Sequence, residues 1–158
     1  MKKLFAILTV LCLMCAACAA MADMKIPEWD SMPAAVIEDE NTSVDDAAFE
    51  GEWVLDTAFL GTEYIDEQTL AGSFGFNFMP IRIAEGKITQ DLQRENGEFV
   101  TLETAYTFEA GQLQGVDGSG VSFAVDLLED GNIVLSVFLP GEGDAVTCLS
   151  LFLKHPAE

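Results

Sequence analysis

The chain has 158 residues, of which 27 are acidic and seven are lysine or arginine, so its formal net charge at pH 7 is −20. Such a charge repels phosphate backbones and anionic membrane surfaces, which argues against nucleic-acid binding and against direct adsorption to a membrane. The single histidine also leaves little room for histidine-based triads or zinc sites.

Residues 1–22 have the three parts of a bacterial export signal. Met1-Lys2-Lys3 is a short basic start, an uncharged apolar run follows it, and small residues lead to Ala20-Met21-Ala22. The apolar run is shorter than the roughly 20 residues that span a membrane comfortably. We therefore expect residues 1–22 to direct export, and the protein to have an extracytoplasmic location.

Two processing routes remain open for this segment. Cleavage after Ala22 would release a freely secreted protein. Alternatively, Cys15-Ala16-Ala17-Cys18 resembles a lipoprotein box, with Cys15 where an aliphatic residue is usual, and lipidation of Cys18 would tie the protein to a membrane. Cys15 is lost by either route, so a Cys-x-x-Cys redox or metal site is not expected.

Residues 23–48 carry eight acids, one lysine and two prolines. This composition and the lack of a sustained period predict an acidic tether between the export signal and the folded domain. Trp29 within it either docks on the domain or stays exposed. Near the end of the segment, Ser43 is followed by acids, which predicts a helix N-cap and a short helix over 44–49.

From Phe49 onward the chain alternates between turn signals and runs rich in β-branched and aromatic residues. The turn signals recur about every dozen residues, at Glu85-Gly86, Asn96-Gly97, Ala110-Gly111, Asp117-Gly118, Asp130-Gly131 and Gly141-Glu142-Gly143. This spacing predicts antiparallel strands joined by hairpins. The nearest approach to a helix is a turn or short helix around 66–70.

Alternation of apolar and polar residues predicts which side chains of each strand face inward. The predicted inward rows are Trp53, Leu55, Thr57 and Phe59; Ile81 and Ile83; Val100, Leu102, Thr104, Tyr106 and Phe108; Val121, Phe123, Val125 and Leu127; and Ile133, Leu135, Val137 and Leu139. The last run, 145–154, is apolar on both faces, so its orientation stays open.

These elements predict an all-β domain over 49–158. About eight such strands joined by short turns favour an antiparallel up-and-down β-barrel, because closure removes the exposed strand edges. A β-sandwich satisfies the same pattern and remains the alternative.

The first predicted strand opens with Phe49-Glu50-Gly51-Glu52-Trp53-Val54-Leu55. This stretch resembles the F-x-G-x-W-x-L opening of the lipocalin and fatty-acid-binding (calycin) superfamily, and the domain is similar to lipocalin-like domains in secreted bacterial proteins. The resemblance implies that Trp53 fills the closed end of a barrel. It also implies a basic side chain packed over that tryptophan, for which Lys154 is the candidate.

The chain departs from the calycin pattern in two places. It lacks the T-D-Y motif and the Arg-x-Tyr pair that holds a carboxylate in fatty-acid-binding proteins, so the resemblance does not imply a fatty-acid ligand. A second resemblance is to META-type domains of bacterial envelope proteins, which also begin G-x-W and contain a G-C-N stretch that Gly75-Phe76-Asn77 partly matches.

The chain has no Gly-rich phosphate loop, nucleophile elbow or metal-spaced His/Cys cluster. We therefore expect no catalytic residue, metal or cofactor, and a protein that is not an enzyme. Cys148 lies in a strand-like run, where cysteine usually behaves as a small buried hydrophobe.

The inward aromatic residues permit a binding hypothesis. They predict an apolar ligand site lined by Trp53, Phe59, Tyr106, Phe108 and Phe123, unless these side chains simply fill the interior. The expected function is that of an exported, monomeric barrel that binds a small apolar molecule or serves as a cell-envelope accessory. The alternative is a protein-interaction or inhibitor module whose acidic loops dock a basic partner.

Overall fold

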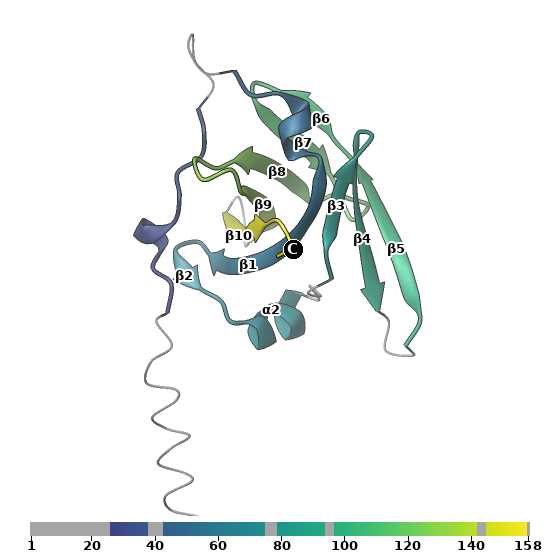
Figure 1. Ribbon diagram of the computed structural model, residues 1–158. Coiled ribbons are helices and arrows are strands. Elements are labelled where there is room, and N and C mark those ends of the chain that lie inside the picture. Colours follow the sequence, from purple (N-terminus) through teal and green to yellow (C-terminus); the bar gives the residue numbers. More distant parts are fainter. Residues whose placement is uncertain (1–25, 38–42, 75–78, 94–96, 142–144, 158) are drawn as a thin grey trace, which may run out of the picture.

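The computed structural model describes residues 26–37, 43–74, 79–93, 97–141 and 145–157. The predicted export signal, including Cys18, and the Gly75-Phe76-Asn77 stretch lie outside the described residues. Most of the described chain is antiparallel strand, wound into a nearly closed barrel with one small α-helix (Figure 1). The predicted all-β class is therefore confirmed.

Ten strands, one α-helix and two short 3-10 helices make up the described part of the chain. The strands are β1 (Gly51–Leu60), β2 (Glu63–Tyr64), β3 (Ile81–Ala84), β4 (Lys87–Gln93), β5 (Phe99–Ala105), β6 (Thr107–Glu109), β7 (Gln112–Val116), β8 (Ser122–Leu127), β9 (Ile133–Pro140) and β10 (Val146–Lys154). The helices are η1 (Trp29–Ser31), η2 (Asp46–Phe49) and α2 (Glu67–Phe74).

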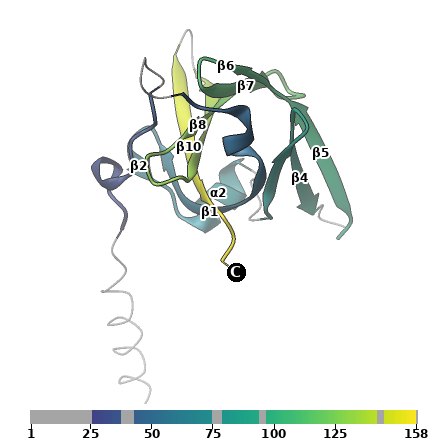
Figure 2. The same ribbon diagram turned by 45° about the horizontal axis from the view of Figure 1, so that its top comes forward.

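The strands pair in the order β5-β4-β3-β1-β10-β9-β8-β7-β6, with β2 attached to β1. The two ends of this path, β5 and β6, are separated in the chain only by Tyr106. The path therefore returns on itself, and the strands form a ring in which β6 and β7 lie between β5 and β8 (Figure 2). Counting β5 and β6 as one bent strand and leaving β2 aside, this is the predicted eight-stranded up-and-down barrel.

Tyr106 fixes the corner where the bent strand changes partner. Its backbone N–H donates to the carbonyl oxygen of Gly86 at 3.1 Å, and its hydroxyl donates to Oδ1 of Asp46 at 3.3 Å. Partial burial and the nearby Asp46 carboxylate raise the pKa of Tyr106, so the hydroxyl keeps its proton at neutral pH. The chain pairs with β4 before this corner and with β7 after it.

The structure shows which side chains of β8, β9 and β10 face the barrel interior. Phe123, Val125 and Leu127 of β8 and four residues of β9 contact the interior core, as predicted; the four are Ile133, Leu135, Val137 and Leu139. In β10, whose orientation was open, Leu149, Leu151 and Leu153 belong to the same interior core. The residues between them, such as Phe152, lie on the outer face.

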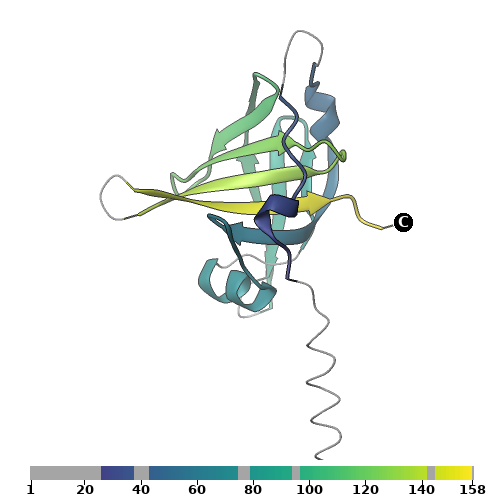
Figure 3. The ribbon, with the colours of Figure 1, turned by 90° about the vertical axis from the view of Figure 1, so that its left-hand side faces the viewer.

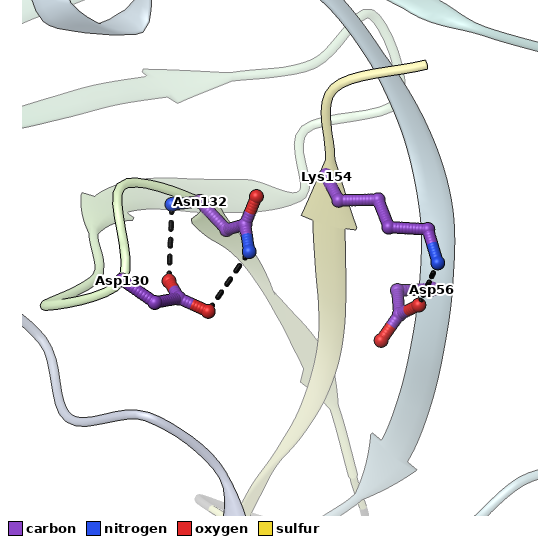
Figure 4. Close-up of polar contacts among 4 residues, drawn as sticks. All are labelled: Asp56, Asp130, Asn132 and Lys154. Atoms are coloured by element: carbon purple, nitrogen blue, oxygen red, sulfur yellow. Dashed lines mark hydrogen bonds and ion pairs between the residues drawn. The ribbon is translucent and has the colours of Figure 1, made fainter. Parts of the chain in front are cut away.

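The predicted inward row of β1 is wrong beyond Leu55. The pairing of β1 with β10 shifts by one residue between Leu55 and Thr57, which marks Asp56 as the extra residue of a β-bulge. The bulge reverses the faces that follow it, so Ala58 joins the interior core and Phe59 lies outside. The Asp56 carboxylate forms an ion pair with Lys154 on the neighbouring strand (Figure 4).

Residues 26–37, here called the N-terminal strap, cross the outer face of the barrel over β9 and β10 (Figure 3). The Trp29 ring meets Phe59 and Phe152 edge-on, with centroids 5.3 and 5.9 Å apart. The backbone N–H of Val36 donates to the carbonyl oxygen of Leu127 at 2.7 Å. This part of the predicted tether is thus docked on the barrel, and it covers the apolar outer cluster to which Phe59 belongs.

An aspartate precedes each of the helices η2 and α2. Asp45, rather than the predicted Ser43, caps η2, because its carboxylate accepts the backbone N–H of Ala47 at 3.1 Å. Asp66 accepts the backbone N–H of Thr69 at 2.9 Å, and this bond lowers the pKa of Asp66. The helix that follows, α2, extends beyond the predicted turn and places Leu70 fully within the core.

Candidate ligand-binding cavity

The barrel holds a half-open cavity of about 410 Å³, which is within the usual size range of small-molecule sites. Its wall is mainly aliphatic and consists of Ile81, Ile88, Gln90, Leu102, Thr104, Asp117, Ser119, Val121, Phe123, Leu135, Val137, Leu139, Leu149 and Leu151. Leu102 is 48% exposed whereas Leu151 is 1% exposed. The cavity therefore runs from the molecular surface into the core, and the side chains do not fill the interior.

The mouth of the cavity lies where β5 separates from β7. An added Cβ on Gly115 of β7 would lie 2.8 Å from the carbonyl oxygen of Ala105, so the two strands approach closely near the corner. Farther along, Leu102 and Thr104 of β5 face the turn that follows β7, and both sides line the cavity. β5 and β7 therefore approach closely near Ala105 and Gly115, whereas the cavity lies between them near Leu102 and the turn after β7. We call this gap between β5 and β7 the seam of the barrel.

The turn at the mouth is built around Asp117. Its Oδ1 accepts hydrogen bonds from the backbone N–H of Ser119 at 2.8 Å, the Ser119 hydroxyl at 2.7 Å and the backbone N–H of Val121 at 2.9 Å. Partial burial raises the pKa of Asp117, but these hydrogen bonds outweigh it, so the pKa lies below the ordinary value of 3.8. The mouth therefore carries a negative charge at neutral pH.

The depressed pKa makes the stability of this turn depend on pH. The ionised carboxylate stabilises the fold above pH 3.8, and this contribution is lost as the pH falls through the lowered pKa. We expect Asp117→Asn to reduce the free energy of unfolding by roughly 0.5–1.5 kcal/mol at pH 7. The deficit should shrink below pH 3.8. Urea denaturation at successive pH values measures it, and a pH-independent deficit would contradict the assignment.

Of the five aromatic residues predicted to line the cavity, only Phe123 does so. Phe59 lies outside because of the bulge at Asp56. Tyr106 occupies the corner between β5 and β6. Phe108 is 38% exposed and packs against Phe49, with ring centroids 6.3 Å apart.

Trp53, the fifth of these residues, is completely buried beside the cavity rather than lining it. Its ring stacks on His155 at a centroid distance of 3.9 Å and an interplanar angle of 27°, and its Nε1–H donates to the carbonyl oxygen of Phe49 at 2.9 Å. The expectation that Lys154 covers this tryptophan is wrong, because Lys154 pairs with Asp56 and the next residue, His155, supplies the ring.

Sequence reasoning missed Gln90, the polar residue of β4 that lines the cavity. Its Nε2 atom is buried and has no hydrogen-bond partner among the residues that the structure describes. Gln90 pairs with Ile81 on β3 and with Leu102 on β5. The available signal was its spacing of two from Ile88, which places both on one strand face.

Within the described ranges, no group of three or more His, Cys, Asp or Glu side chains is placed to hold a metal ion. Asp130, in a turn, accepts the backbone N–H of Asn132 at 3.0 Å and its side-chain amide at 2.8 Å (Figure 4).

Among the residues that the structure describes, no helix has the length and apolar character to cross a membrane.

The fold and this cavity define the class of protein: a nearly closed antiparallel β-barrel with an interior cavity that reaches the surface through one seam. Comparison of the chain with models of known protein families found no match, and comparison with curated proteins found no similar sequence.

Proposed function

We propose that the protein is an exported, non-enzymatic, lipocalin-like barrel that binds a small apolar molecule in its interior cavity. The single observation that carries this proposal is the aliphatic cavity of about 410 Å³ that leads from the surface at Leu102 to buried Leu151. Removal of apolar surface from water is favourable by about 25 cal/mol per Å². A site with this lining therefore favours a hydrocarbon-rich ligand over a polar one.

The arrangement of the wall supports binding rather than catalysis. The deep side chains, such as Leu149, Leu151 and Leu135, are buried and carry no reactive group. The polar side chains lie at the mouth, with the exception of Gln90, and Oδ1 of the Asp117 carboxylate there accepts hydrogen bonds within its own turn. Export is supported by the sequence of residues 1–22.

Fluorescence of the apolar probe N-phenyl-1-naphthylamine tests the proposal. The probe brightens when it leaves water, so we expect saturable enhancement with the unmodified protein, and little change as salt rises because apolar binding is weakly screened. Val137→Phe replaces an isopropyl group on the cavity wall with a bulkier phenyl ring and should reduce probe affinity at least tenfold. Gln114→Phe, which adds the same ring on an exposed site of β7, is the matched control and should leave affinity unchanged.

Two outcomes would contradict the proposal. One is the absence of saturable enhancement, and the other is an equal effect of the Val137 and Gln114 variants, which would place the probe outside the cavity. Binding of a basic protein partner that collapses as salt rises would instead support an interaction module.

A further inference from the structure

The buried amide of Gln90 is the one feature of the cavity wall that apolar binding alone leaves unexplained. Its neighbours on the adjacent strands are aliphatic, with Ile81 on one side and Leu102 on the other. Nε2 nevertheless carries two N–H donors and is shielded from solvent, without a hydrogen-bond partner in the described chain. Buried polar groups in proteins are nearly always hydrogen-bonded, so this donor indicates a missing acceptor.

The position of the amide indicates where that acceptor comes from. Gln90 lines the cavity, so a molecule in the cavity lies beside its side chain. Nε2 itself is covered in the empty protein, so a bond to the ligand requires the side-chain amide to rotate, but no strand has to move. A carbonyl oxygen is a pure acceptor and matches an N–H donor. Leucine or methionine at this position would fill similar space without a buried donor, so the glutamine has a cost that a ligand would offset.

The charges around the cavity select against an anionic ligand. Among the described residues, no lysine, arginine or histidine lines the cavity. Lys87 pairs with Glu103 at 2.8 Å, and Lys154 pairs with Asp56. A carboxylate held at the mouth would face the ionised Asp117, and a carboxylate held deep would lose its hydration without a cation to replace it.

We propose that the cavity takes an uncharged, mainly aliphatic molecule with one carbonyl-type acceptor, such as a ketone, ester or amide, and that Nε2 of Gln90 donates a hydrogen bond to that acceptor. This inference rests on the proposed function, because it requires that the cavity binds a ligand. It adds that recognition depends on one polar contact and that fatty-acid anions are rejected.

Three probes of equal chain length test the inference: undecan-2-one, undecane and undecanoate. Their affinities are measured by displacement of N-phenyl-1-naphthylamine at pH 7 from the unmodified protein, from Gln90→Leu and from Gln114→Leu. Gln114 is an exposed glutamine of β7, so its variant controls for the substitution itself. Gln90→Met, which is close to glutamine in shape, provides a second variant that removes the donor with the least change in packing.

We expect Gln90→Leu and Gln90→Met to weaken the ketone roughly tenfold, the value of one buried hydrogen bond. Undecane should bind the variants as tightly as the unmodified protein, or more tightly. Undecanoate should bind the unmodified protein more weakly than the ketone. Removal of an unpaired buried donor should also leave the melting temperature of the empty variants equal or higher by a few degrees.

The failures of the two proposals are distinguishable. If the Gln90 variants weaken ketone and alkane equally, or if undecanoate binds the unmodified protein best, the cavity binds ligands but the assignment to Gln90 and to neutral carbonyl compounds is overturned. If none of the three probes displaces the fluorophore, and Val137→Phe does not affect it, the proposed function fails and this inference with it.

Discussion

Replacing Trp53 with alanine should lower the free energy of unfolding by about 3–5 kcal/mol, the usual cost of truncating a buried aromatic residue. The side chain is completely buried and forms the stacked contact with His155 at 3.9 Å. Its loss also leaves the carbonyl oxygen of Phe49 without the indole donor. Urea denaturation followed by circular dichroism measures the change.

The other described tryptophan provides the control for this experiment. Trp29 is 37% exposed and packs on the outside of the barrel through the N-terminal strap. We expect Trp29→Ala to cost about 1–2 kcal/mol, in keeping with its partial burial. Equal losses for the two variants would contradict the conclusion that Trp53 is a core side chain while the strap only covers the outer face of the barrel.

A methyl group added at Gly115 should destabilise the fold by about 1–3 kcal/mol, as overpacking of a well-packed site does. An ideal Cβ there would lie 2.5 Å from Cζ of Phe123 and 2.8 Å from the carbonyl oxygen of Ala105. The ring can move, but the carbonyl belongs to the β5 backbone, so the strands must separate. Because Phe123 lines the cavity, Gly115→Ala should also weaken binding of the fluorescent probe.

Gly118→Ala is the matched control for Gly115→Ala. An added Cβ at Gly118 meets no atom within 4 Å, and its φ is not in the left-handed region, so the expected change in unfolding free energy is within about 0.5 kcal/mol. A Gly115 variant as stable as the Gly118 variant would contradict the close approach of β5 and β7.

The hairpin pattern and the inward rows of β8 and β9 were predictable because an apolar residue recurs there at every second position. Val125 and Leu135, for example, face the core as their spacing from neighbouring apolar residues required. Alternation failed in β1 because one extra residue, Asp56, reverses the face of everything after it. A bulge is a feature of the pairing between two strands, and Asp56 looks like any polar residue in the sequence of one strand.

The structure differs from the sequence-based expectation at two other places, the strap and the partner of Trp53. Both differences arise from contacts between distant parts of the chain. Residues 23–48 read as an acidic tether because they carry eight acids, yet Trp29 and Met32 within them supply the apolar contacts that dock the strap. Sequence spacing near the C-terminus likewise could not choose between Lys154 and His155 as the partner of Trp53. The choice follows from the ion pair that holds Lys154 at the bulge.

The sequence left open whether the barrel holds a cavity or is filled by side chains, and the lining proposed for a cavity was mostly wrong. Aromatic residues were predicted to line the cavity because they are large and apolar, whereas the wall is mostly leucine, isoleucine and valine. Large aromatic side chains such as Trp53 and Phe49 are packed in the core, and others such as Phe59 lie in the outer cluster, so the open space remains beside smaller aliphatic ones. Gln90 was passed over because an isolated glutamine in a mixed strand gives no sign of burial.

The central claim is that the interior of the barrel is a ligand site organised around Gln90, and a nitrogen–proton correlation spectrum recorded during titration with undecan-2-one tests it most directly. The account predicts that the side-chain amide signal of Gln90 moves furthest among the side-chain amides, while the amide signal of exposed Gln114 stays in place. Perturbations confined to the outer face near Phe152 and the strap, with Gln90 unchanged, would contradict the claim.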